Sequence, residues 1–143
     1  MLSWLIDRWR LGRLSSLSTA QVGAMGERIA ARYLASEGMR VIERNTDMTG
    51  GEIDLIALDQ DQKTVVFVEV KTRRLPSDRH ERYRPEVSIT PQKRKKLVRL
   101  AERVTRDRGW EDRQKRIDVI AVELASRAAP VIRHHRAAVD RSR

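Results

Sequence analysis

Three carboxylates and a lysine interrupt two apolar runs in the segment GEIDLIALDQDQKTVVFVEVKTR, which spans residues 51–73. Asp54 lies in the first run and Glu69 in the second, and Lys71 follows Glu69 by two places. Clustered carboxylates near an apolar sheet are costly unless a cation compensates them. Mg²⁺ is commonly held by one or two carboxylates together with water and phosphate oxygens. These residues therefore favour metal-assisted hydrolysis of a phosphodiester, with Lys71 contacting the phosphate or the attacking water.

Two strands joined by a turn would have to position these side chains. The runs at 51–58 and 64–72 predict β-strands, and the polar residues 59–63 predict the turn of a hairpin. Because side chains alternate with a period of two, Phe67, Glu69 and Lys71 should share one face of their strand. In the preceding strand, one face should carry Ile53, Leu55 and Ala57, and the other Glu52, Asp54 and Ile56. Pairing then brings Asp54 near Glu69 or Lys71, either as a metal site or as cross-strand ion pairs.

A helix before the hairpin offers a further acid. It should run from about Ala20 to Glu37, capped by Ser18 or Thr19 and ended by Gly38. Glu27 is in line with small and apolar residues on the face expected to meet the sheet, namely Gly23, Ala30, Ala31 and Leu34. Small residues at 23, 26 and 30 would let the helix approach closely and carry Glu27 toward the hairpin.

The remaining patterns complete an α/β fold. Residues 39–44 and 115–124 predict strands, and a second helix should open at Thr90-Pro91 and end at Gly109. Residues 130–135 would add a late edge strand. The order α-β-β-β-α-β implies one domain with a mixed sheet flanked by helices. We expect this domain at residues 19–125, between an N-terminal extension at 1–18 and a basic tail at 126–143.

Charge indicates a polyanionic partner. Thirty Lys and Arg against twenty Asp and Glu give a formal net charge of +10, which favours nucleic acid. Much of the second helix is basic, and Lys93 lies near its start, where anions are attracted. The predicted nucleic-acid contacts are Lys93, Lys95, Lys96, Arg99, Arg73 and Arg74. The alternative is an ordinary solvated helix face.

The ends of the chain carry weaker signals. No apolar run reaches the roughly 18 to 20 residues of a membrane span. Residues 2–14 have apolar positions at helical spacing, so they predict a short basic amphipathic helix that either docks on its own domain or contacts a membrane surface. The chain has no cysteine, which is compatible with a cytoplasmic location. We expect a structural ion pair for Asp118, and we interpret His134 and His135 as tail residues rather than metal ligands.

Several motifs together resemble a known family. GEIDLIA and VFVEVKTR, preceded by GAMGERIAARYLASEGMRVIERN and followed by TPQKRKKL and RIDVIAV, are similar to the YraN-like family, uncharacterised protein family 0102, over about residues 23–122. That family resembles the PD-(D/E)XK nuclease superfamily, which includes restriction endonucleases and archaeal Holliday-junction resolvases. By resemblance, Asp54, Glu69 and Lys71 match the metal-binding and catalytic positions of the superfamily. Glu27 matches the helical glutamate of the resolvase-like branch.

The resemblance and the residues lead to the same hypothesis. We expect an endonuclease dependent on Mg²⁺ or Mn²⁺, acting on DNA and on branched or structured DNA in particular. Glu27, Asp54 and Glu69 would bind the metal, and Lys71 would orient or activate water. A homodimer is compatible with this reading. The alternative is a nucleic-acid-binding scaffold that keeps the fold without catalysis.

Overall fold

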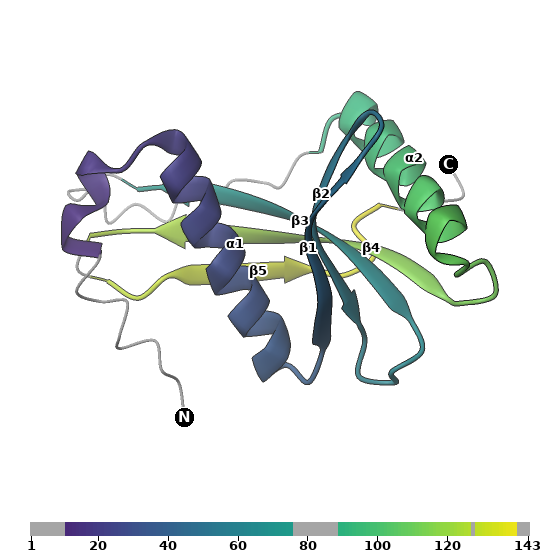
Figure 1. Cartoon of the computed structure of the whole chain (residues 1–143). Coiled ribbons are helices and arrows are strands. Elements are labelled where there is room, and N and C mark those ends of the chain that lie inside the picture. The colour runs from purple at the N-terminus through teal and green to yellow at the C-terminus, as the bar shows by residue number, and fades with distance from the viewer. Residues whose placement is uncertain (1–10, 76–88, 127, 140–143) are drawn as a thin grey trace.

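The protein folds around one five-stranded sheet. The computed structural model describes residues 11–75, 89–126 and 128–139. The elements follow in the order η3 (Leu11–Ser16, a 3₁₀ helix), α1 (Thr19–Ser36), β1 (Arg40–Met48), β2 (Gly51–Leu58), β3 (Val65–Arg74), α2 (Pro91–Arg108), β4 (Lys115–Leu124) and β5 (Val131–His135) (Figure 1). The predicted α/β class and the α-β-β-β-α-β order are confirmed.

The strands lie in the sheet in their sequence order, β1-β2-β3-β4-β5. Neighbouring strands are antiparallel except β3 and β4, which are parallel and are connected by way of α2. A parallel pair needs such a crossover, because a tight turn can join only antiparallel strands. The sheet is therefore mixed, as expected, and the late strand predicted at 130–135 forms its β5 edge.

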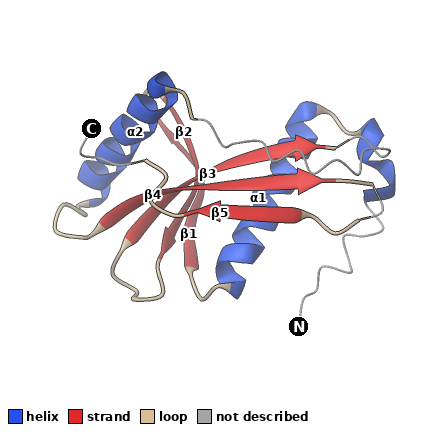
Figure 2. Ribbon diagram, turned by 180° about the vertical axis from the view of Figure 1, so that it is seen from behind, coloured by secondary structure: helices blue, strands red, loops and turns tan. Residues whose placement is uncertain are grey.

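The two long helices pack on opposite faces of the sheet. Ala30 and Leu34 of α1 share a core cluster with Leu55 and Val68. Leu97 and Leu100 of α2 belong to a second cluster, with Phe67 and Ile117 among the strand residues. In Figure 1 α1 crosses in front of the strands, and the view from behind in Figure 2 places the strands before it. Each face of the sheet thus has its own apolar layer.

Local capping fixes where the helices begin and end. Ser18 accepts a hydrogen bond from the Gln21 backbone N–H at 3.1 Å, and the Gln21 side chain accepts one from the Ser18 N–H at 2.8 Å. Thr90 caps α2 in the same position, with Pro91 as the first helical residue. Gly109, at φ 68°, ends α2 in the left-handed conformation that glycine adopts without strain. The predicted boundaries of both helices are confirmed to within one residue.

One prediction about β2 is wrong. Strict alternation placed Ile53 and Leu55 on one face, but Ile53 packs in the cluster of α2 and Leu55 in the cluster of α1. The ladder between β2 and β3 runs only from Leu55 opposite Val68 to Leu58 opposite Val65, whereas β2 stays paired with β1 down to Gly51. The strand therefore turns between Ile53 and Leu55, where it leaves β3 to follow β1.

The N-terminal segment is in part attached to the sheet. Residues 2–10 of the predicted amphipathic helix lie outside the described residues, and residues 11–16 form η3. Leu14 is 1% exposed and belongs to the core cluster of α1. The Arg74 guanidinium donates hydrogen bonds to the carbonyls of Leu14 and Leu17 at 2.8 and 2.9 Å. Across the described part of the chain, no helix combines the length and apolar content needed to cross a membrane.

Candidate functional site

The candidate site lies where β2 and β3 separate. Asp54 is the first residue of β2 beyond the ladder, and Glu69 is the corresponding residue of β3, next to Val68. The Asp54 carboxylate accepts a hydrogen bond from the Val70 backbone N–H at 2.8 Å, so it occupies a position that a further ladder bond would have taken. Where the two strands separate, the Val70 N–H has no backbone partner in β2, and the Asp54 carboxylate accepts its hydrogen bond instead. Asp54 and Glu69 therefore come together at this fork, as the hairpin predicted.

Glu27 reaches the fork because α1 lies unusually close to β3. A Cβ added to Gly26 would lie 1.7 Å from Thr72 Oγ1 and 2.7 Å from Thr72 Cβ. Only a residue without a side chain fits there, so Gly26 sets the distance between helix and strand. The next residue, Glu27, is half-buried, and one of its carboxylate oxygens lies within 4.8 Å of carboxylate oxygens of Glu52 and Asp54. The predicted close approach is confirmed at Gly26, whereas a Cβ added to Gly23 would have no atom within 4 Å, so Gly23 takes no part in it.

Glu52 was not among the predicted site residues. It precedes Asp54 by two places on the same expected face of β2, and that spacing is the signal that could have found it. It is exposed, yet its carboxylate completes a group of three with Glu27 and Asp54. Three carboxylates from two elements thus converge, and such oxygen donors suit hard cations such as Mg²⁺ or Mn²⁺.

Asn45 of β1 joins two of these acids. Its side-chain amide lies 3.0 Å from Glu52 Oε1 and 2.9 Å from Glu27 Oε2. Ionised carboxylates only accept hydrogen bonds, so the amide nitrogen is the atom that faces them. The backbone of Asn45 has φ 48°, a left-handed conformation that asparagine tolerates better than most residues. Asn45 therefore holds Glu27 and Glu52 together from a third element, a role that the sequence did not indicate.

Burial and the neighbouring negative charges raise the pKa of two of these acids, Asp54 and Glu27. Burial raises the pKa of Asp54 to about 7, and the charges of Glu69, Glu27 and Glu52 add to this effect against the hydrogen bond from Val70. Burial and the charges of Glu52 and Glu69 also raise the pKa of Glu27. A cation bound among these oxygens would reverse the sign of the local field. The electrostatics of the fork therefore favour a bound cation.

Glu69 differs from the other acids because it has a cationic partner. Its carboxylate lies 2.8 Å from the ammonium of Lys93, in the first turn of α2. The Glu69 side chain is only 10% exposed, against 36% for Lys93. Lys93 was predicted to contact nucleic acid, and the structure brings it into the fork itself. Its role toward a phosphate stays a prediction.

Lys71 lies two residues beyond Glu69 on β3 and is half-buried. Among the residues that the structure describes, its side chain forms no hydrogen bond or ion pair, so its ammonium is available for a ligand. Lys93 thus places one ammonium group against Glu69, whereas Lys71 follows Glu69 by two places on β3.

The predicted basic surface begins beside the fork. Lys95, Lys96 and Arg99 are all exposed on α2. The Lys96 side chain crosses over the start of β2, since a Cβ on Gly51 would lie 2.7 Å from Lys96 Cε. Arg73 is exposed at the end of β3, whereas the Arg74 guanidinium is occupied by the backbone carbonyls that precede α1. The role of these five side chains toward nucleic acid stays a prediction.

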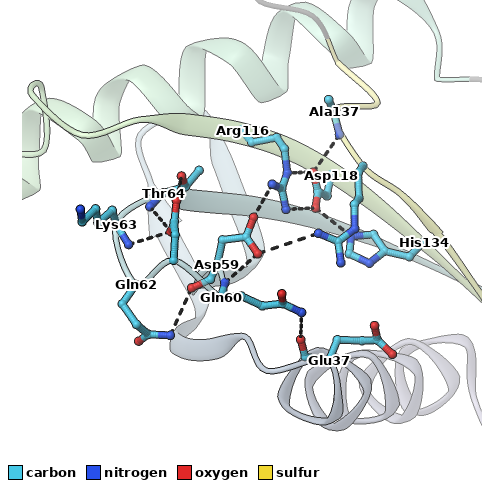
Figure 3. A network of polar contacts seen from close by, with 12 residues as sticks. Glu37, Asp59, Gln60, Gln62, Lys63, Thr64, Arg116, Asp118, His134 and Ala137 are labelled. Atoms are coloured by element: carbon cyan, nitrogen blue, oxygen red, sulfur yellow. Dashed lines mark hydrogen bonds and ion pairs between the residues drawn. The ribbon is translucent and has the colours of Figure 1, made fainter.

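A second polar cluster lies away from these acids, around β4 and β5 (Figure 3). Asp118 is fully buried and accepts hydrogen bonds from Arg116 at 2.8 and 3.1 Å, from His134 at 2.7 Å and from the Ala137 N–H at 2.9 Å. Although burial opposes its ionisation, these donors hold the pKa of Asp118 below its ordinary value. Arg116 also pairs with Asp59, in the turn after β2. The structural ion pair expected for Asp118 is confirmed.

The interpretation of His134 as a tail residue is wrong. Its side chain is 4% exposed, and its ring meets Tyr33 of α1 edge-on, with the ring centroids 5.5 Å apart. The edge strand was predicted at 130–135, but the sequence did not show which face its residues take; pairing with β4 turns His134 inward and leaves His135 exposed. His134 therefore links the edge strand to α1 and to Asp118.

Known proteins match most of this chain. Residues 26–122 match the model of a family described as uncharacterised protein family UPF0102. A UPF0102 protein from Mycobacterium sp. (strain KMS) is 43% identical over 126 residues, covering 87% of this chain and 89% of that protein. One from Streptomyces griseus subsp. griseus is 45% identical over 122 residues (80% and 92%), and one from Geobacter sulfurreducens is 40% identical over 113 residues (79% and 84%). The matched residues 26–122 include all four acids of the fork and both lysines beside them.

Proposed function

The chain belongs to the uncharacterised protein family UPF0102, as its motifs indicated, and on that premise we propose that it is a metal-dependent endonuclease. Its reaction is the hydrolysis of phosphodiester bonds in DNA, with branched or structured DNA as the expected substrate. The family description names no activity, so the proposal rests on the residues at the fork and on the resemblance to PD-(D/E)XK nucleases. A DNA substrate would place the reaction in the cytoplasm.

The observation that carries the proposal is the convergence of acids. Carboxylate oxygens of Glu27, Glu52 and Asp54 lie within 4.8 Å of one another, and the charge of Glu69 acts on both Asp54 and Glu27. This oxygen donor set fits Mg²⁺ or Mn²⁺, and Glu27, Asp54 and Glu69, together with Glu52, would hold the ion. When bound, the metal would polarise the phosphate and lower the pKa of a coordinated water.

The chain's own residues would orient the reacting groups. The Val70 N–H holds one oxygen of Asp54 at 2.8 Å, which leaves the other oxygen for a ligand. Asn45 fixes Glu27 and Glu52 in the same way. Lys71, whose side chain has no hydrogen bond or ion pair among the described residues, would contact the scissile phosphate or orient the attacking water. Lys71 thereby supplies a positive charge where negative charge develops.

The protein would bind its substrate mainly through contacts between basic side chains and the phosphates of the DNA backbone. The net charge of +10 and the exposed Lys95, Lys96 and Arg99 favour contacts that depend on salt and little on base sequence. Such binding suits an enzyme that selects the shape of DNA. The start of α2 would lie next to the cleaved phosphate, because Lys93 already contacts Glu69.

A cleavage assay tests the proposal. Linear, nicked, single-stranded and four-way-junction DNA are incubated with Mg²⁺ or Mn²⁺ and with either the wild-type protein or Asp54→Asn. We expect cleavage by the wild type alone, with a preference for the branched substrate. Binding without cleavage by either protein would contradict the proposal and favour the non-catalytic scaffold.

A further inference from the structure

Lys93 occupies a position that is unfavourable for a lone cation. It is the third residue of α2, and its backbone N–H donates to the Thr90 hydroxyl in the helix cap at 3.2 Å. The N-terminal end of a helix carries partial positive charge, so acids are favoured there and lysines are not. The first turn of α2 contains no acid. A lysine at this place therefore needs a compensating partner, and Glu69 provides it.

Glu69 needs a partner as well. Its side chain is 10% exposed, and it lies near enough to Asp54 and Glu27 to raise the pKa of both. A nearly buried carboxylate beside other acids is costly unless a cation is paired with it. The ammonium of Lys93, at 2.8 Å, is that cation. The other three acids of the fork have no such pair with a lysine or arginine among the described residues.

We infer that Lys93 is a counter-ion that a divalent cation displaces from Glu69. The inference rests on the proposed function, because it assigns Lys93 a role at the same metal site. A cation bound to Asp54 would be attracted to Glu69 as well, and it would repel the ammonium that now holds this carboxylate. Lys93 is a third exposed and its side chain is long, so it can turn outward without moving the helix.

The displaced ammonium would then meet the substrate. It would lie at the start of α2 beside the acids, where a phosphate bound to the metal would also lie. Lys93 is therefore a positioning residue, which pairs with Glu69 before the metal binds and with a phosphate oxygen afterwards. Metal binding and substrate binding become coupled through one side chain, and such coupling acts equally in both directions.

Metal affinity measured without DNA tests the displacement. Mn²⁺ is titrated calorimetrically into the wild type, Lys93→Met, Lys93→Arg and the control Lys95→Met, which removes the same charge from an exposed position of the same helix. Lys93→Met should bind Mn²⁺ roughly fivefold more tightly, because no ammonium competes for Glu69. The Mn²⁺ affinities of Lys93→Arg and Lys95→Met should remain near that of the wild type. The first variant keeps a cation that competes for Glu69, and the second removes a lysine that does not contact Glu69.

Unfolding in chelator tests the ion pair itself. Lys93→Met should lower the melting temperature of the wild type by several degrees but change it little in a Glu69→Gln background. Equal Mn²⁺ affinity in Lys93→Met and the wild type, or weaker affinity in the variant, would overturn the role of Lys93 and leave the proposed function standing. Absence of Mn²⁺ binding in the wild type would overturn both. If Lys93→Met lowers the melting temperature equally in the wild type and in Glu69→Gln, the pairing of Lys93 with Glu69 is contradicted.

Discussion

The contact between Gly26 and Thr72 gives the sharpest test of how this fold builds its site. Adding one methyl group at Gly26 places a Cβ 1.7 Å from Thr72 Oγ1, 2.6 Å from Thr72 Cγ2 and 2.7 Å from Thr72 Cβ. Rotation of the threonine can relieve the first two contacts. It cannot relieve the third, because Cβ is fixed to the backbone of β3. Carbon atoms prefer about 3.5 to 4.0 Å, so α1 must move away by about 1 Å.

The size of the effect follows from two opposing terms. Overpacking of this kind costs about 1 to 3 kcal/mol, and the severity of these contacts favours the upper end. Alanine is the better helix former by about 1 kcal/mol, which offsets part of the cost. Gly26→Ala should therefore lower the free energy of unfolding by about 2 kcal/mol. It should also weaken Mn²⁺ binding, because the displaced helix withdraws Glu27 from Asp54.

Gly23 is a matched control on the same helix. A Cβ added there would have no atom within 4 Å, so Gly23→Ala gains helix propensity without a clash. It should raise the free energy of unfolding by about 0.5 to 1 kcal/mol. Urea denaturation of both variants measures the difference, and calorimetry measures Mn²⁺ affinity. If Gly26→Ala is as stable as Gly23→Ala, the close packing of α1 on β3 does not set the site.

Three further predictions concern charge. Between the ordinary pKa of 3.8 and about 7 the folded protein keeps Asp54 protonated, so the free energy of unfolding falls as pH rises through this window. In chelator, Asp54→Asn should therefore raise the free energy of unfolding by about 2 kcal/mol at pH 8, which is half of the full linkage value to allow for solvent screening. At pH 5 the gain should be less than half as large, and urea unfolding measures both values. Millimolar Mn²⁺ should raise the melting temperature of the wild type and of Lys71→Ala, whereas Glu69→Gln should lose most of the rise; an equal rise in all three would contradict the ligand assignment. Lys95→Ala combined with Arg99→Ala should reduce the slope of log binding constant against log salt by about 2 for duplex DNA, and an unchanged slope would remove α2 from the footprint.

The fold was predictable because the residues that begin and end its helices and strands act locally. Thr90, Pro91 and Gly109 mark the ends of α2 without reference to any distant residue. The strand at 51–58 is likewise bounded by glycines and by a polar turn. The first strand was predicted at 39–44 but extends to Met48. Three of its four extra residues are polar, and the extension gains its conformation from pairing with β2, which no local pattern shows.

The site was only partly predictable, for a related reason. Period-two alternation and the hairpin were enough to bring Asp54 toward Glu69, and the small residues of α1 were enough to bring Glu27. The turn of β2 away from β3 depends on tertiary packing, so no local pattern could predict it. Glu52 was missed although its spacing from Asp54 placed both acids on one expected face.

Two contacts at the site also needed the whole fold. Asn45 reaches the acids from β1, and its backbone adopts a left-handed conformation. No sequence pattern predicted this contact. Lys93 and Glu69 are separated by 24 positions and meet only because the crossover returns α2 to the start of the fork. Contacts of this kind depend on topology rather than on spacing, so the sequence alone could not pair these residues.

The central claim is that the acids at the fork support metal-dependent hydrolysis, and one measurement tests it most directly. A four-way DNA junction is bound to the protein in chelator, and cleavage is followed in time after excess Mn²⁺ is added. In the wild type, cleavage should begin on addition of metal, whereas Asp54→Asn should bind the junction equally but not cleave it. Cleavage at the same rate by both proteins, or none by the wild type, would contradict the claim.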